Sequence, residues 1–292
     1  MPSHVLTLIA ADTGRSRIAE TAGAIASQLN SEADWLASDR AADIFFDGDT
    51  ANAEIIGKRE VSDAAIDVVI QPWVSRRKKL LVADMESTII QNEMLDEMAG
   101  LLGISDRVAE VTHRAMNGEL DFAASLRARV ALFKGGPESL LSEAATHIRF
   151  SPGAATLVST MRRHGARTVM VSGGFDYFCR PVRDALGFDR VYANDIIVLN
   201  GCLTGAVREP ILDGAAKREY LRQSAAEFGV AQAGVLAVGD GANDLPMLLA
   251  AGLGIAYHAK PHVRAQIADR IDHADLSALL YIQGYRAADL VG

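Results

Sequence analysis

From residue 80 onward, apart from residues 92–148, the chain alternates short apolar runs with stretches that have a helical pattern. Each run is about four residues long, as is typical of a buried strand. The predicted strands are residues 80–83, 168–171, 235–238 and 254–257. The predicted helices are residues 154–164, 177–186, 215–228 and 244–251. This alternation predicts an α/β fold in which helices cover both faces of a mostly parallel sheet.

Between the first two strands, residues 92–148 have an almost wholly helical pattern. Glycine and proline divide this segment, because both residues commonly interrupt helices. The predicted helices are residues 93–102, 105–117, 121–134 and 137–147. We expect them to form an inserted bundle that covers a site. Further along, Asn200-Gly201 separates two apolar runs, at 196–199 and 202–204, and predicts a tight hairpin.

Residues 1–74 have a different pattern and predict a small α+β domain that precedes a larger domain of residues 75–292. Its predicted elements are strands at residues 5–10, 41–46 and 65–70 and a helix at residues 15–29. The segment between the last two strands has no clear pattern. Asp47-Gly48-Asp49 suits a solvated turn that closes a strand better than it suits a metal loop.

Composition excludes some classes of partner. The chain has 292 residues and a formal net charge of −8, which argues against nucleic acid or an anionic membrane as a main partner. The short basic run Arg76-Arg77-Lys78-Lys79 is interpreted as a solvated linker. The chain has two cysteines, Cys179 and Cys202, which lack metal-type spacing, so we expect both to be buried. With no secretory pattern or long apolar stretch, a cytoplasmic protein is expected.

Four short segments, far apart in the sequence, carry the residue types of a phosphate-transfer site. They are Asp84-Met85-Glu86-Ser87-Thr88, Ser172-Gly173-Gly174, Lys217 and Gly239-Asp240-Gly241-Ala242-Asn243-Asp244. Three of the four lie at or just beyond the end of a predicted strand. Ligands of open α/β sheets bind beyond the carboxyl ends of the strands. We therefore expect the segments to meet in one crevice.

Asp84 and Glu86 are two residues apart, so both side chains can point to the same side of the chain. An aspartate can attack phosphorus and form an aspartyl-phosphate. A second carboxyl group can protonate the leaving oxygen and then activate water. The alternative is a helix start, where acidic residues are stabilised by the helix dipole.

The other three segments suit the binding of phosphate and metal. Glycine after a strand lets backbone N–H groups approach phosphate, and Ser172 adds a hydroxyl donor. Lys217 supplies a positive charge, although a lone lysine is usually a surface residue. Asp240, Asn243 and Asp244 offer the oxygen ligands that Mg²⁺ prefers. The alternative for this last segment is an Asp-Gly turn that caps a helix.

With these residues in place, the chain resembles the haloacid dehalogenase superfamily of aspartyl-phosphate phosphatases, and within it the phosphoserine phosphatases. The family's first motif is Asp-x-Asp-x-Thr, and this chain departs from it because Glu86 replaces the second aspartate. Ser172, Lys217 and residues 239–244 match the other motifs. The resemblance covers about residues 78–284 and implies a parallel sheet of the Rossmann type with an inserted helical cap. Residues 1–74 are loosely similar to an ACT-like module.

The resemblance also assigns residues to roles. In the inserted helices, Glu93 matches the residue that contacts the serine part of the substrate, and Arg129 matches the residue that binds its carboxylate. The remaining assignments place Met116 and Phe122 in the pocket wall, Ser172, Gly173 and Asn243 at the substrate, and Asp84, Glu86 (through its carbonyl) and Asp240 at Mg²⁺. Asp84, Glu86 and Lys217 are the expected catalytic residues.

The implied activity is hydrolysis of O-phospho-L-serine to serine and phosphate, the last step of serine biosynthesis. Two alternatives stay open from the sequence. One is a related enzyme that acts on another small phosphomonoester. The other is a sensor of phosphoserine or an amino acid. In that case the site has lost catalytic turnover, because the Glu86 side chain is one methylene longer than that of aspartate. The resemblance also suggests a homodimer.

Overall fold

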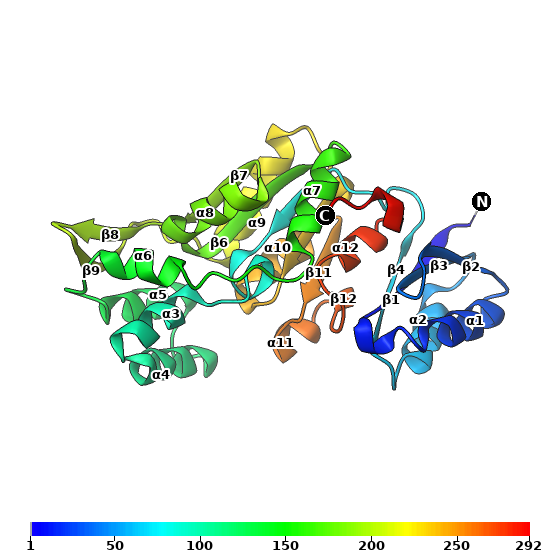
Figure 1. The fold of residues 1–292 in the computed structure, drawn as a ribbon, viewed down its shortest axis with the longest axis horizontal. Helices are drawn as coiled ribbons and strands as arrows, with labels where there is room; N and C mark the ends of the chain where they lie inside the picture. The colour runs from blue at the N-terminus through cyan, green and yellow to red at the C-terminus, as the bar shows by residue number, and fades with distance from the viewer. Residues whose placement is uncertain (1) are drawn as a thin grey trace.

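The computed structural model describes residues 2–292. Its centre is a six-stranded sheet with the strand order β12-β11-β10-β5-β6-β7, in which all neighbouring strands are parallel. The strands are β5 (Leu80–Ala83), β6 (Arg167–Phe175), β7 (Arg190–Asn194), β10 (Val235–Gly239), β11 (Leu253–Tyr257) and β12 (Arg270–Ile271). Figure 1 shows this sheet between the inserted helices on the left and the N-terminal segment on the right.

Strand β5 shows why a continuous apolar run marks the centre of the sheet. Leu80 and Val82 pack against one layer of helices, and Leu81 and Ala83 pack against the other. The first layer contains α9 (Gly214–Glu227) and α10 (Leu245–Ala250), and the second contains α7 (Ala154–Arg163), α8 (Asp176–Leu186) and α12 (Ala278–Tyr281). A strand covered on both faces needs apolar residues at every position. The predicted α/β architecture is therefore confirmed.

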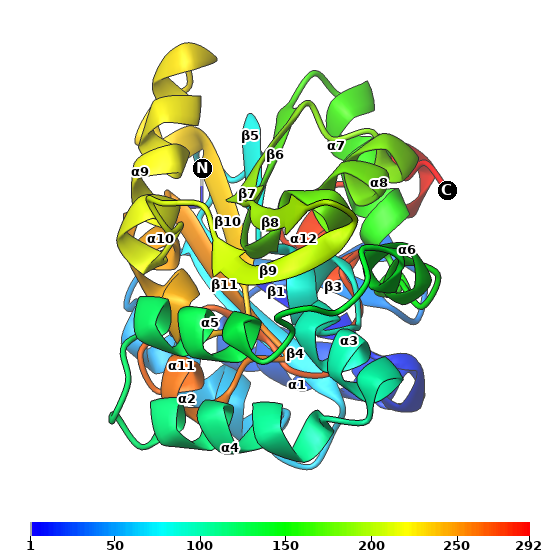
Figure 2. The same cartoon turned by 90° about the vertical axis from the view of Figure 1, so that its left-hand side faces the viewer.

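The inserted helices follow β5 and precede β6 along the chain. They are α3 (Met94–Leu102), α4 (Ser105–Met116), α5 (Phe122–Ala131) and α6 (Ser139–Ala145). Asp121 caps α5, because its carboxylate accepts a hydrogen bond from Ala124 N at 2.7 Å. The hairpin of β8 (Ile196–Leu199) and β9 (Cys202–Val207) joins this group, as the N–H of Gly135 donates to the Leu203 carbonyl at 2.9 Å. Figure 2 shows α5 in front of the central sheet, with α4 below it.

The N-terminal sheet is antiparallel with the order β2-β3-β1-β4, and two helices complete a βαββαβ arrangement consistent with an ACT-like domain. Its elements are β1 (His4–Ala10), α1 (Ile18–Gln28), β2 (Ala33–Ala37), β3 (Ala41–Phe46), α2 (Thr50–Glu60) and β4 (Ile66–Pro72). The hydrophobic pattern does not reveal β2 or α2. Helix α2 buries only Ala53, Ile56 and Gly57, so its apolar stripe is too narrow to recognise.

Two local predictions have different outcomes. The turn at residues 47–49 is confirmed, because Asp49 caps α2 through Ala51 N, and Asp47 accepts a hydrogen bond from Ser3 N at 2.7 Å. Cys179 is buried, but Cys202 is exposed at the start of β9, so the prediction of burial is wrong for the second cysteine. Among residues 2–292, no helix combines the length and apolarity that a membrane crossing needs.

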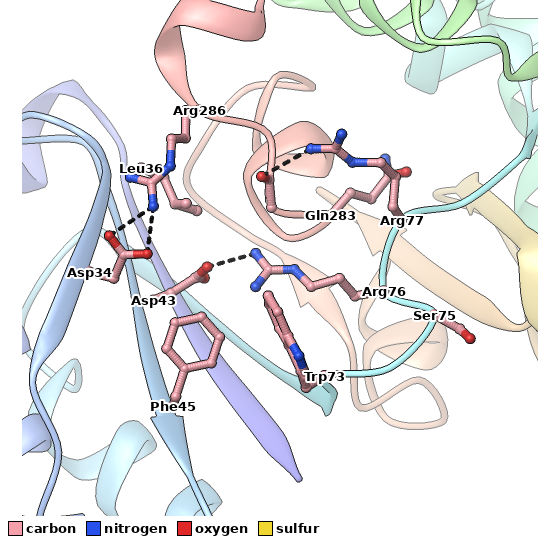
Figure 3. A pocket seen from close by; sticks show the side chains of 11 residues that line it. Asp34, Leu36, Asp43, Phe45, Trp73, Ser75, Arg76, Arg77, Gln283 and Arg286 are labelled. Atoms are coloured by element: carbon pink, nitrogen blue, oxygen red, sulfur yellow. Dashed lines mark hydrogen bonds and ion pairs between the residues drawn. The ribbon is translucent and has the colours of Figure 1, made fainter. Parts of the chain in front are cut away.

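The interpretation of residues 76–79 as a solvated linker holds for Arg77 and Lys79, which are exposed, but is wrong for Arg76 and Lys78. Arg76 is only 5% exposed and pairs through Nη2 with Asp43 Oδ2 at 2.7 Å (Figure 3). Lys78 is also buried, and its ammonium group donates to the carbonyls of Ser75 and Ala233, both at 3.0 Å. The run lies in the joint between the two sheets, where long basic side chains bury their stems and find acceptors for their heads.

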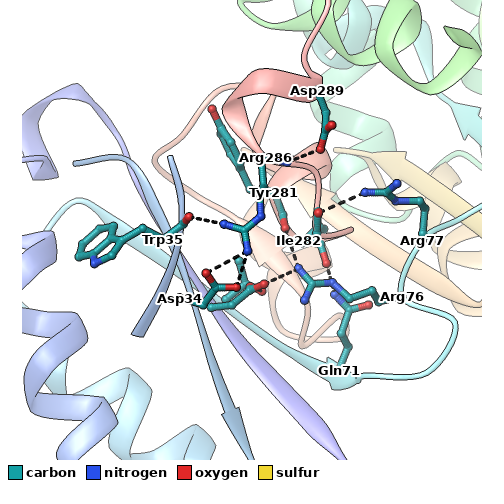
Figure 4. A network of polar contacts seen from close by, with 12 residues as sticks. Asp34, Trp35, Gln71, Arg76, Arg77, Tyr281, Ile282, Arg286 and Asp289 are labelled. Atoms are coloured by element: carbon teal, nitrogen blue, oxygen red, sulfur yellow. Dashed lines mark hydrogen bonds and ion pairs between the residues drawn. The ribbon is translucent and has the colours of Figure 1, made fainter. Parts of the chain in front are cut away.

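The joint also ties the N-terminal sheet to the last part of the chain. Arg286 donates to the Asp34 carboxylate and the Trp35 carbonyl, as Figure 4 shows. At the opposite edge of the same sheet, on β4, the Asp67 carboxylate accepts hydrogen bonds from the backbone N–H groups of residues 272–274 at 2.8–3.2 Å. Asp67 is 4% exposed, so these N–H groups depend on it.

Replacing Asp67 by alanine should lower the free energy of unfolding by about 3 kcal/mol, because several sheltered N–H groups lose their acceptor. Urea unfolding followed by circular dichroism measures the change. The matched control is Glu54→Ala on the exposed side of α2, which should cost no more than about 0.5 kcal/mol. Equal effects of the two substitutions would contradict the structural role of Asp67.

Candidate active site

Three of the predicted segments meet at the carboxyl ends of three adjacent strands. Asp84 directly follows β5, Ser172 lies near the end of β6, and Asp240 directly follows β10. Strand β5 pairs with both β6 and β10, so the three residues lie side by side at one edge of the sheet. Lys217, in the first half of α9, reaches the same place from the helical layer.

Lys217 is the fixed charge at the centre of the site. It is fully buried, and its Nζ lies 2.7 Å from Asp84 Oδ1 and 2.6 Å from Asp244 Oδ1. Burial by itself lowers the pKa of Lys217, but the neighbouring charges of Asp244 and Asp84 raise it above its ordinary value. The ammonium group is thus charged throughout the neutral range. The ammonium group lies behind Asp84, and Lys217 is not among the residues that line the cavity described below.

Asp84, Asp240 and Asp244 form a cluster that fits a metal ion. Each offers one carboxylate oxygen, and these three oxygens lie within 4.8 Å of one another. Burial is the main reason that the pKa of Asp84 lies well above its ordinary value and that the pKa of Asp240 is raised to about 6. Lys217 alone does not balance three carboxylates. An oxygen-ligand set with excess negative charge suits a hard divalent cation.

Asp244 also shapes the loop that presents Asp240. Its Oδ2 accepts hydrogen bonds from the backbone N–H groups of Asp240 at 3.1 Å and Gly241 at 3.0 Å. A Cβ at Gly239 would lie 2.5 Å from the Asp244 carboxylate, so only glycine fits there. Asp244 therefore holds both the lysine and the turn, which explains an aspartate at this position.

Glu86 points toward the start of the inserted helices. The chain turns sharply after it, with Ser87 at φ 54°, and Glu86 Oε1 accepts a hydrogen bond from Met94 N at 2.9 Å. Burial, and then the charge of Glu93, raise the pKa of Glu86 to about 8. A Cβ at Gly174 would lie 2.8 Å from Glu86 Oε2. The missing side chain at Gly174 thus leaves room for the longer acid in place of aspartate.

A cavity of about 600 Å³ lies between the inserted helices and this edge of the central sheet. Its wall includes the following sequence-predicted residues: Asp84, Glu86, Glu93, Phe122, Arg129, Gly173, Asp240 and Asn243. Arg129 Nε is buried and has no hydrogen-bond partner in the described part of the chain. The Phe122 ring covers Gly173, where a Cβ would lie 2.7 Å from Cζ of the ring.

Like Lys217, Ser172 does not line the cavity. Ser172 is fully buried and lies outside the cavity wall, where its Oγ accepts a hydrogen bond from Gly174 N at 2.9 Å. Met116 ends α4, but its side chain lies outside the described part of the structure.

Three charged residues of the wall were not predicted as site residues: Asp121, Asp213 and Lys260. Lys260 lines the cavity, and its Nζ lies 3.5 Å from Asp240 Oδ2. A single lysine before Pro261 forms no motif, but it follows the predicted strand at 254–257 by three residues. Because β11 is parallel to β10, its carboxyl end lies at the same edge of the sheet. The position of Lys260 just after a predicted parallel strand was the signal that could have placed it at the site.

Residues 81–249 match the family of haloacid dehalogenase-like hydrolases. The chain belongs to this family. Within it, the hydrolase is 39% identical over 235 residues to a phosphoserine phosphatase of Mycobacterium tuberculosis. The matched region covers 80% of this chain and 57% of that protein. It is 42% identical over 227 residues to one of Streptomyces coelicolor, of which it covers 55%. The hydrolase thus spans a little over half the length of these two relatives.

Solved structures agree with the fold. A probable phosphoserine phosphatase of Vibrio cholerae matches 99% of this hydrolase and 88% of its own chain, with a TM-score of 0.77 and 32% identity. Its match includes the N-terminal sheet. A structure described as a phospho-aspartyl intermediate analogue of phosphoserine phosphatase matches 70% of this chain and 98% of its own, with a TM-score of 0.66 and 38% identity. The hydrolase is therefore a member of the phosphoserine phosphatase group.

Replacing Lys217 by methionine should lower the free energy of unfolding by about 3–5 kcal/mol near pH 7, because it leaves buried carboxylates without their cation. A lysine whose pKa is raised in the folded state stabilises the fold fully below its unfolded pKa, so the wild type keeps this contribution through the neutral range. In the variant, the pKa of Asp84, raised mainly by burial, should let this carboxylate take up a proton as the pH falls, so part of the lost stability should return at lower pH.

Urea unfolding at several pH values checks this, with Arg222→Met on the exposed side of α9 as the control. A loss of stability that does not change with pH would contradict the role of the buried carboxylates.

Proposed function

We propose that this hydrolase cleaves O-phospho-L-serine to L-serine and phosphate with the help of Mg²⁺. The observation that carries the proposal is the contact of the Lys217 ammonium group with Asp84 and Asp244, beneath a cavity whose opposite wall carries Glu93 and Arg129. The names of the relatives support the choice of substrate, and the structure of an intermediate analogue supports an aspartyl-phosphate.

In this proposal Asp84 attacks phosphorus and becomes phosphorylated. Lys217 holds the Asp84 carboxylate in place and offsets the charge of the phosphoryl group. Glu86, whose pKa is raised to about 8, is protonated near neutral pH and gives its proton to the serine oxygen. The same carboxylate then takes a proton from the water that attacks the aspartyl-phosphate, and Asp84 is regenerated as phosphate leaves.

Asp84, Asp240 and the Glu86 carbonyl would hold Mg²⁺, with Asp244 and Asn243 in support. When bound, the ion supplies positive charge that reduces the repulsion between the attacking carboxylate and the phosphate. The Gly173 N–H and Ser172 complete the proposed phosphate contacts.

The inserted helices would recognise the amino-acid part of the substrate. Arg129 has a buried Nε without a partner, and an arginine binds a carboxylate through parallel hydrogen bonds. The Glu93 carboxylate, which accepts a hydrogen bond from Ser87 Oγ at 2.7 Å, would meet the ammonium group. Phe122, together with Met116 by resemblance, would contact the small carbon skeleton. A homodimer and a cytoplasmic location stay predictions.

Replacing Asp84 by asparagine should abolish Mg²⁺-dependent phosphate release from phosphoserine, because the amide cannot act as the nucleophile. Phosphate release by the purified proteins is the measurement. The surface variant Glu143→Gln should keep the wild-type rate. If the wild type itself released no phosphate above background, the proposed activity would be wrong and a binding role would be favoured.

Gly174→Ala should reduce kcat at least tenfold in the wild type, because the new Cβ occupies the space of the Glu86 carboxylate. The same substitution should cost much less in a Glu86→Asp background, where the shorter acid leaves that space free. A double-mutant cycle on kcat measures the coupling. Equal losses of kcat in both backgrounds would show that Gly174 does not provide the space for the Glu86 carboxylate.

A further inference from the structure

A second cavity lies in the joint between the two sheets, away from the active site. Its volume is about 380 Å³, and it shares no wall residue with the active-site cavity. One wall is the face of the N-terminal sheet that carries Asp34, Leu36, Asp43 and Phe45. The other wall comes from the connector and the last part of the chain, through Trp73, Ser75, Arg76, Arg77, Gln283, Gly284 and Arg286. Figure 3 shows the two walls facing each other.

The charges of this cavity do not balance. Its wall has three arginines and two aspartates, which leaves one positive charge. Each aspartate already has an arginine: Asp43 pairs with Arg76, and Asp34 pairs with Arg286, both at 2.7 Å. Arg77 has no carboxylate within ion-pair distance among residues 2–292. Its guanidinium group donates only to the Gly284 carbonyl at 3.2 Å and stacks over the Tyr285 ring at 4.0 Å.

Arg76 is buried, yet part of its hydrogen-bonding capacity is unused. Its Nη2 contacts Asp43 and the Tyr281 carbonyl, but Nε and Nη1 have no partner in the described part of the chain. Gly284 lies against the guanidinium group so closely that a Cβ would be 2.8 Å from Cζ. Buried N–H groups without an acceptor cost free energy, so an added acceptor on this side would be favoured.

Beside the charged residues, Ser75, Gln283 and Gly284, the cavity wall is formed by one apolar and two aromatic side chains: Leu36, Phe45 and Trp73. Phe45 and Trp73 meet edge to face, with ring centroids 4.9 Å apart, and Leu36 lies on the same sheet face as Phe45. Trp73 is still 38% exposed, although the Arg76 guanidinium group lies over its ring. A concave site with aromatic walls and a few converging polar groups is the usual form of a small-molecule pocket.

We propose that this cavity binds a small monocarboxylate that carries an apolar group about the size of a phenyl ring. The carboxylate would contact Arg77 and the free side of Arg76, and the apolar group would pack on Trp73 and Phe45. The ligand needs no ammonium group, because both aspartates of the wall are already paired. This distinguishes it from the amino-acid substrate proposed for the active site. A bound ligand would bridge the N-terminal sheet and residues 283–286.

The two tryptophans of the chain provide a direct test. Trp35→Phe leaves Trp73 as the sole tryptophan, so fluorescence reports this cavity. In that background, 3-phenylpropionate should give a saturable change in emission. The neutral 3-phenylpropanamide and acetate, which lack the charge and the ring respectively, should bind at least tenfold more weakly.

Arg77→Met should weaken the binding of 3-phenylpropionate at least tenfold, whereas the exposed control Arg222→Met should leave it unchanged. Circular dichroism establishes that each variant is folded. The proposal is overturned if no saturable change occurs, if the amide binds as well as the acid, or if Arg77→Met has no effect. Loss of the signal in Arg129→Met would place the ligand in the active-site cavity and equally overturn it. The readout is binding, so the outcome does not depend on phosphoserine turnover.

Discussion

The contact of one buried ammonium group with two buried carboxylates sets the geometry of the whole site. Lys217 can occupy its position only because Asp84 and Asp244 both face it, and each aspartate comes from a different strand end. Removing charges from water is costly, and close, well-oriented partners are needed to offset that cost. The adjacent strands β5 and β10, together with α9, must therefore keep a fixed arrangement. The other parts of the site are positioned relative to this fixed arrangement.

The sequence predicts the elements whose burial is uniform and misses those whose burial is mixed. The run at residues 80–83 has apolar residues at every position, so its place in the centre of a parallel sheet is evident. Strand β7 lies at the sheet edge and is only partly buried, and β12 has two residues, so neither produces a clear pattern. Helix α2 is missed because most of its residues face solvent.

Charge was the least reliable guide to exposure. Residues 76–79 look solvated in the sequence, yet Arg76 and Lys78 are buried because the joint supplies acceptors from distant segments. The part of the candidate site that is built from sequence motifs was predictable, because the four segments meet as expected. Lys260 was missed because its importance comes from the strand that precedes it, and the fit of Gly174 to Glu86 depends on a distance that no sequence spacing encodes.

The hydrogen bond from Met94 N to Glu86 has a consequence for modular engineering. The acidic group belongs to the core, but its donor is the first residue of α3, so the inserted helices help to set its acidity. Grafting the helices of another family member onto this core would therefore change the hydrogen bonding of Glu86 together with the wall of the cavity. The surroundings of Glu86 and the shape of the cavity therefore cannot be changed independently.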